Sequence, residues 1–135
     1  MKVLHVIGSR SGLFRISPVY RALRAAGVET QVIVFAGRRA DMAPEASFLA
    51  ELDLPEPDYV LGVTAGSSAM LTGKSLIALE PIVSRMVPDW IFAVGDVDAA
   101  LAAALVGRKN GIPIANLEAG LRTGDDSRRV RSTGF

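Results

Sequence analysis

The residues best suited to chemistry lie in a short segment near the end of the sequence, directly after an apolar run. Residues 112–117 are mostly apolar, which is typical of a buried strand, and Glu118 follows them at once. A glycine-rich turn that contains Arg122 comes next. In an open α/β sheet, ligands bind at the carboxyl ends of the strands, because strand ends and helix N-termini meet there. We therefore expect Glu118 to point into a cleft; the alternative is that it caps the turn and pairs with Arg122.

A second candidate segment lies near the start of the chain. The apolar run 3–7 leads into a glycine-flanked turn at 8–12, which begins at Gly8, and a helical pattern follows. A strand, a glycine-bearing turn and a helix form a common cradle for phosphate, since backbone N–H groups and the positive helix end favour an anion. Arg10 and Arg15 add positive charge there, although they could equally be two solvated arginines. The glycine spacing is not Gly-x-Gly-x-x-Gly, so it does not favour NAD.

The third candidate is Gly95 followed by Asp96, after the apolar run 90–94. Further strands are expected at 28–36 and 59–61. A first helix should start near Ser17 and Pro18, and a short helix should run over 44–52 with Asp41 as a possible cap. We expect a long helix over 68–87, kinked or split by Pro81, and an alanine-rich helix over 99–106.

Strands that alternate with helices predict a doubly wound, Rossmann-like parallel α/β sheet of five strands in the order 3-2-1-4-5. This order brings Gly8 and the arginines opposite Asp96, with Glu118 on the neighbouring strand. We expect Gly8, Asp96 and Glu118 to cluster at one carboxyl edge, because each closely follows a strand.

Composition excludes several classes of function. The chain has 135 residues, a formal charge of +1 and no cysteine, so it predicts a single domain without disulfides or thiolate metal sites. The near-neutral charge does not favour nucleic acid or an anionic membrane, and no apolar run is long enough to span a bilayer. His5, the one histidine, is interpreted as a packed core residue. We expect a cytoplasmic protein without a metal or a bound cofactor.

Together these motifs resemble the N-terminal half of the non-hydrolysing UDP-N-acetylglucosamine 2-epimerases, two-domain enzymes with a glycosyltransferase-B-like fold. The resemblance covers nearly the whole chain, and the segment 118–124 (Glu-Ala-Gly-Leu-Arg-Thr-Gly) is its most specific part. It implies an isomerase that converts UDP-GlcNAc to UDP-ManNAc for cell-envelope polysaccharide synthesis. It also implies Asp96 and Glu118 as catalytic residues, with Arg10 and Arg15 near the nucleotide sugar. We place Gly8, Gly95 and Arg122 in the same substrate site.

The chain departs from the family pattern at several positions. Arg38 and Asn116 stand where the family has histidines, and the family's Pro-Glu-Glu motif is not found after Arg129. We expect residues 1–124 to form the Rossmann-like domain, with 125–135 as a disordered or intermolecular tail. The family's second domain is not in this sequence, so we expect the chain alone to be inactive unless a homo-oligomer or a separate C-terminal half completes it. The alternative is a stand-alone flavodoxin-like module that binds a phosphate or FMN.

Overall fold

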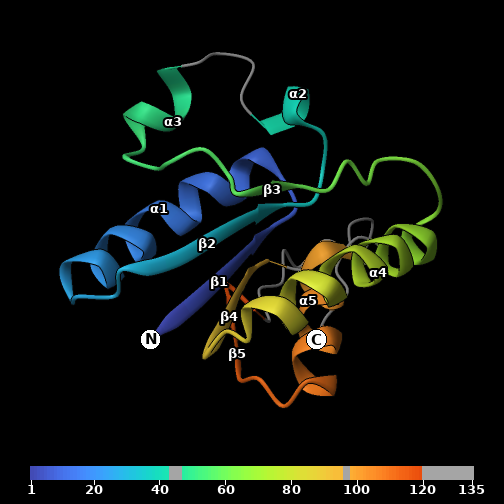
Figure 1. The fold of residues 1–135 in the computed structure, drawn as a ribbon. Helices are drawn as coiled ribbons and strands as arrows, with labels where there is room; N and C mark the ends of the chain where they lie inside the picture. The colour runs from blue at the N-terminus through green and yellow to red at the C-terminus, as the bar shows by residue number, and fades with distance from the viewer. Residues whose placement is uncertain (43–46, 96–97, 120–135) are drawn as a thin grey trace.

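The computed structural model describes residues 1–42, 47–95 and 98–119. Its elements alternate along the chain, with helices on both faces of one sheet (Figure 1). The strands are β1 (Lys2–Ile7), β2 (Thr30–Phe35), β3 (Tyr59–Val60), β4 (Trp90–Val94) and β5 (Ile114–Leu117). The helices are α1 (Arg10–Ala25), α2 (Arg39–Met42), α3 (Ser47–Glu51), α4 (Ser68–Met86) and α5 (Asp98–Lys109).

The five strands are all parallel and lie in the order β3-β2-β1-β4-β5, which confirms the predicted topology. β1 is central, pairing with β2 from Lys2 to Ile7 and with β4 from Val3 to Val6. The sheet order reverses between β1 and β4, and in doubly wound folds a ligand cleft opens at this switch point.

Alternate residues of each strand belong to two separate cores. Leu4 and Val6 pack with the buried side chains of α4 and α5, whereas Ile7 packs with those of α1 and α3. Successive side chains of a strand point to opposite faces, so a strand covered on both sides is apolar throughout. The helices α1 and α3 therefore cover one face of the sheet, and α4 and α5 cover the other (Figure 1).

Two prolines lie inside helices; a helix start was expected near Pro18, and a kink or a split was expected at Pro81. α1 begins at Arg10 rather than near Ser17, so Pro18 falls in its middle, and α4 is continuous through Pro81. A proline removes the hydrogen bond to the carbonyl four residues earlier. Those carbonyls belong to Phe14 and Ile77, whose residues are 55% and 73% exposed, so both prolines lie on solvent-facing sides of their helices.

Several other boundaries also differ from those predicted. β2 begins at Thr30 rather than at 28, and β5 begins at Ile114 because Pro113 has no N–H for the ladder. The short helix predicted at 44–52 is seen as α3 from Ser47, while residues 43–46 lie outside the described residues. The helical turn α2 was not predicted, and it contains Asp41. None of the helices in the described ranges combines the length and apolarity needed to cross a membrane.

Candidate functional site

Three of the predicted site positions are the first residues after adjacent parallel strands. Gly8 follows β1, Gly95 follows β4 and Glu118 follows β5. Parallel strands end at the same edge, so the backbone places all three at the carboxyl edge. The Gly95 N–H donates to the Leu117 carbonyl at 2.9 Å, which ties the ends of β4 and β5 together. Asp96 and Arg122 lie outside the described residues, so their positions stay predictions.

Arg15 reaches from α1 across the end of β4 to Glu118. Its Nε lies 2.9 Å from Glu118 Oε2, and the two side chains are 44% and 41% exposed. Gly95 lies directly beneath this pair, since a Cβ added there would be 3.7 Å from Arg15 Nη1. The switch point therefore carries an ion pair whose partners come from distant parts of the chain and remain open to solvent. Glu118 pairs with Arg15 here, whereas the sequence suggested Arg122 as an alternative partner.

The backbone at this edge adopts a conformation that L-amino acids rarely take. Glu118 has φ 62° and Gly95 has φ 73°, both in the left-handed region. Glycine takes this region at no steric cost, but a residue with a Cβ does not. A non-glycine residue held there by its surroundings is a common feature of functional sites.

The start of α1 lies against the end of β1. Only Gly8 and Ser9 separate the two elements, so the expected loop over 8–12 is replaced by the first turn of the helix. A Cβ on Gly12 would lie 2.8 Å from Ile7 Cγ2, so the close approach requires glycine there. Ser9 precedes the helix in an extended conformation, and its side chain makes no capping hydrogen bond. The Gly12 N–H donates to the Ser9 carbonyl at 3.0 Å, so the N–H groups of Arg10 and Ser11 are the ones left for other acceptors.

Arg10 and Arg15 make separate contacts and do not form one pair. The Arg10 guanidinium lies over the Phe48 ring, with 4.3 Å from Cζ to the centroid, and Phe48 belongs to α3. Five residues of helix correspond to about 140° of rotation, so the two side chains leave α1 in different directions. Arg10 is directed toward α3, and Arg15 toward β4 and β5.

His5 is buried in β1, as expected for a core residue. Its ring stacks on Phe92 with centroids 5.6 Å apart, and its Nε2 lies 2.8 Å from Gln31 Oε1. The Gln31 amide nitrogen donates to the Tyr20 carbonyl, which leaves Oε1 to accept from His5 Nε2. Burial lowers the pKa of His5 below its ordinary value of 6.5, and the Gln31 hydrogen bond opposes this only in part. His5 is thus a neutral packing residue at pH 7.

Arg38 and Asn116, two of the positions singled out in the sequence, have different surroundings. Arg38 donates from Nε to Asp41 at 2.9 Å, and this hydrogen bond lowers the pKa of the Asp41 carboxyl. Asn116 lies in β5, one residue before Leu117, and its Oδ1 is buried without a partner among the residues described. Neither contacts the Arg15–Glu118 pair through any described hydrogen bond.

Three contacts near this edge had no signal in the sequence. Ser68 and Thr72, at the start of α4, both donate to the Asp98 carboxylate at the start of α5. The Arg10–Phe48 contact is likewise tertiary, because Phe48 is a core residue by pattern and nothing local links it to an arginine. Within the described ranges, no three His, Cys, Asp or Glu side chains gather as a metal site would need.

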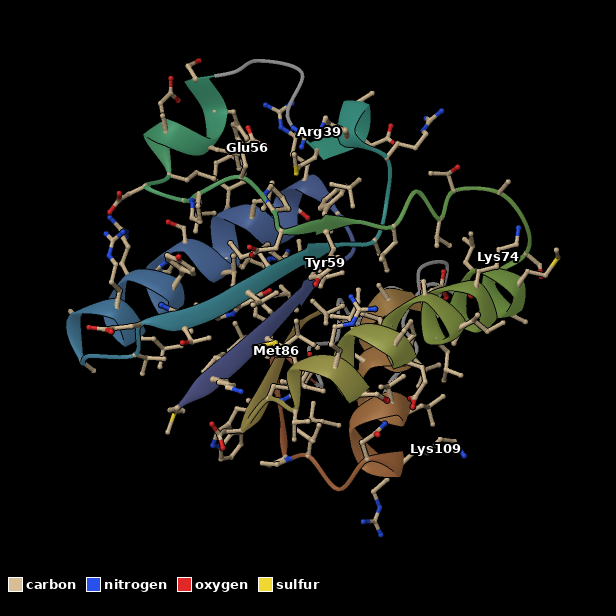
Figure 2. The ribbon with its side chains drawn as sticks, in the orientation of Figure 1. Arg39, Glu56, Tyr59, Lys74, Met86 and Lys109 are labelled. Atoms are coloured by element: carbon tan, nitrogen blue, oxygen red, sulfur yellow. The ribbon has the colours of Figure 1, made fainter. Side chains whose placement is uncertain are left out.

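An apolar groove of about 440 Å³ lies between α4 and α5, but it is remote from these residues. Its lining includes Ile77 and Pro81 of α4 and Lys109 of α5. These belong to the later turns of helices that start at the carboxyl edge, so the groove lies toward the amino ends of the strands (Figure 2, where Lys109 is labelled). The groove is therefore separate from the candidate site.

The fold defines the class of protein, a doubly wound α/β domain, and such domains bind ligands at the switch point of the sheet. The chain belongs to the UDP-N-acetylglucosamine 2-epimerase family, whose model matches residues 21–130. It is 34% identical over 125 residues to the UDP-N-acetylglucosamine 2-epimerase of Methanocaldococcus jannaschii, covering 93% of this chain and 34% of that protein. It is also 33% identical over 123 residues to a UDP-2,3-diacetamido-2,3-dideoxy-D-glucuronate 2-epimerase of Pseudomonas aeruginosa, covering 91% of this chain and 35% of that protein.

Solved structures agree with this assignment. The Methanocaldococcus jannaschii enzyme in complex with UDP-GlcNAc and UDP matches with a TM-score of 0.81 at 34% identity, over 94% of this chain and 35% of that one. The Neisseria meningitidis UDP-GlcNAc 2-epimerase bound to UDP-GlcNAc matches with a TM-score of 0.84 at 26% identity, over 99% of this chain and 36% of that one. The chain thus spans about a third of the length of these relatives, and it is a UDP-GlcNAc 2-epimerase-like domain.

Proposed function

We propose that this chain supplies the Rossmann-like wall of a nucleotide-sugar site and that the complete site epimerises C2 of a UDP-linked sugar. The observation that carries the proposal is the Arg15–Glu118 pair, 2.9 Å long, beside Gly95 at the carboxyl edge of a chain of this family. In this proposal residues 1–124 form the domain, and the opposite wall comes from a second domain or another chain.

The reaction requires a proton to leave C2 and return on the opposite face. In the proposed sequence the C2 proton is removed as UDP departs from C1, which gives a glycal. Protonation of C2 from the other side and return of UDP to C1 then give the epimer. A carboxylate such as Glu118 can accept or return such a proton, and Asp96 is proposed as the second acid. Relatives with this chemistry in their names support the assignment.

Positive charge near the diphosphate stabilises the departing group. Arg15 is proposed for this role because its guanidinium already lies at the edge and contacts Glu118 through Nε. Arg10, Arg122 and the backbone N–H groups at Gly8 and Gly95 would complete the anion site. In the free chain Glu118 neutralises Arg15, so an incoming diphosphate would compete with the carboxylate for the same donors.

The proposal is tested by amide NMR of the ¹⁵N-labelled chain with UDP-GlcNAc, UDP and FMN. We expect UDP-GlcNAc and UDP to shift the amides of Gly8, Ser9, Gly95 and Glu118, because these lie at the carboxyl edge. Arg15→Ala should weaken UDP binding about tenfold through loss of a charge-assisted contact. Arg21→Ala, an exposed arginine later in the same helix, is the matched control. Shifts with FMN and none with UDP would instead support the flavodoxin-like alternative.

The sugar and the cellular role are a finer part of the proposal. The relatives named above act on two different UDP sugars, so a comparison of UDP-GlcNAc with the diacetamido glucuronate distinguishes the two substrates. We propose a cytoplasmic role in supplying sugars for cell-envelope polysaccharides. The lack of cysteine in the chain is consistent with a reducing compartment.

A further inference from the structure

The two arginines at the candidate site are held in different ways. Arg15 is neutralised by Glu118, and the exposed Arg24, Arg38 and Arg39 are each paired with a carboxylate. Among the described residues, Arg10 has no such carboxylate, and its recorded contact is the face of Phe48. A cation held by an aromatic ring keeps its full charge and all of its N–H donors.

The ring beneath Arg10 is itself fixed in place. Phe48 is 7% exposed, and its ring meets that of Phe14 edge to face with centroids 5.1 Å apart. Phe14 lies one turn after Arg10 in α1, on the same side of the helix. The arginine thus packs against a small aromatic cluster formed by α1 and α3, while its own residue stays exposed.

The contact holds the Arg10 guanidinium at a place in the fold where an anion is favoured. Arg10 is the first residue of α1, directly after the carboxyl end of β1, and the side chain of Ser9 leaves the first helical N–H groups uncapped. The N-terminus of a helix and an unpaired guanidinium both favour an anion. A free arginine loses considerable rotamer entropy when a ligand fixes it. Stacking on Phe48 removes part of that cost before the ligand arrives.

We infer that Phe48 is a positioning residue that holds the charged Arg10 guanidinium, which has no carboxylate partner among the described residues, ready for the diphosphate of the nucleotide sugar. The inference rests on the proposed function, because it assigns Phe48 to the same anion site. Phe48 itself does not touch the ligand and acts only through Arg10. Removal of the aromatic face should therefore weaken binding of UDP only when Arg10 is present.

A double-mutant cycle on UDP affinity tests this coupling. The four proteins are the unaltered chain, Arg10→Ala, Phe48→Leu and the double variant, with folding of each checked by thermal melting. Phe48→Leu should weaken UDP binding about two- to fivefold, which corresponds to one exposed cation–π contact. In the Arg10→Ala background the same change should have no further effect. Phe48→Tyr, which keeps the aromatic face, should restore the affinity of the unaltered chain. Equal losses in both backgrounds would overturn the inference, since Phe48 would then act through the fold.

A ligand-free measurement separates failure of this inference from failure of the proposed function. The ring current of Phe48 should move the δ protons of Arg10 upfield relative to those of the exposed Arg21, and Phe48→Leu should abolish the difference. A Phe48-dependent shift supports the positioning even if UDP does not bind, in which case only the proposed function fails. Arg10 protons that resemble those of Arg21 in the unaltered chain would overturn the positioning whatever UDP does.

Discussion

Single residues at the carboxyl edge are held by contacts that sequence patterns do not reveal. The sequence placed Glu118 at the end of a strand and Arg15 near the first turn, and strand order alone brings both to one edge. It did not indicate that they pair, because an ion pair between residues so distant in sequence depends on side-chain directions. Nor did it indicate that Arg10 turns toward Phe48. The sequence therefore predicted where these residues lie but not which side chains they contact.

The buried His5 makes stability depend on pH. Its folded pKa lies below 6.5 because of burial, so the unfolded chain binds a proton first as the pH falls. The stabilisation is therefore complete above about pH 6.5 and is lost as the pH falls below it, by at most about 1.4 kcal/mol per pH unit. Denaturant unfolding between pH 7.5 and 5.5 measures this loss.

The control is His5→Gln, which keeps a donor for Gln31 but does not titrate. His5 is the one histidine in the sequence, so the difference in slope between the two proteins reports this side chain alone. Parallel pH profiles for the two proteins would show that His5 is not buried as described.

At the scale of elements, the order and pairing of strands could be predicted, and some helix boundaries could not. Apolar runs separated by turns define where strands lie, and the handedness of crossovers limits their order. The first helix was expected to start near Pro18, and Pro81 was expected to kink or split α4, because proline disrupts a helix locally. Both helices are continuous, and the residues four positions before the two prolines are exposed. Whether a residue is exposed depends on tertiary packing and cannot be predicted from the local sequence.

Two helical glycines test how closely α5 packs on the sheet and how open the surroundings of α4 are. A Cβ on Gly107 of α5 would lie 2.8 Å from Cδ1 and Cγ1 of Ile114, whereas Gly73 of α4 has nothing within 4 Å. Gly107→Ala should lower the free energy of unfolding by about 1–3 kcal/mol through overpacking. Gly73→Ala should raise it by about 0.5–1 kcal/mol, since alanine is the better helix former. Urea unfolding of both variants provides the comparison, and a loss of stability in both would mean that Gly73 is not in open space.

For the whole molecule, the resemblance predicted from a few motifs is confirmed by the family match and by the fold of solved epimerases. The specific segment after β5 and the glycines after β1 and β4 are enough to identify the family. They do not describe the rest of these relatives, of whose length this chain spans about a third. Asp96, Arg122 and the tail at 125–135 lie outside the described residues, so their expected roles stay predictions.

We expect the 135-residue chain alone not to epimerise UDP-GlcNAc. The side chains of Arg15 and Glu118 are 44% and 41% exposed, so water reaches both groups and screens their effect on the diphosphate. The reaction also needs its acids and cations in place together around the sugar. Incubation in deuterated water, followed by NMR detection of deuterium at C2 or of the manno epimer, measures this directly. The full-length Methanocaldococcus jannaschii relative provides the positive control, and turnover by a confirmed monomer of this chain would contradict the expectation.

The left-handed backbone of Glu118 has a consequence for the relation between stability and activity. A side chain in that region costs about 1–2 kcal/mol, and an ion pair as exposed as that with Arg15 returns less than about 1 kcal/mol. Glu118→Gly should therefore melt at a higher temperature than the unaltered chain, while any activity of a completed site declines because the proposed acid is lost. The control is Val87→Gly, at the left-handed end of α4 with φ 47°. It measures the stability gained when a left-handed residue is replaced by glycine at a position without an ion pair. Glu118→Gln keeps the strain and removes the charge, so it should be slightly less stable.

If Glu118→Gly melted no higher than Glu118→Gln, the backbone at 118 would be relaxed. If it melts higher, Glu118 lowers the stability of the fold, as expected for a side chain that is present because of its chemical role.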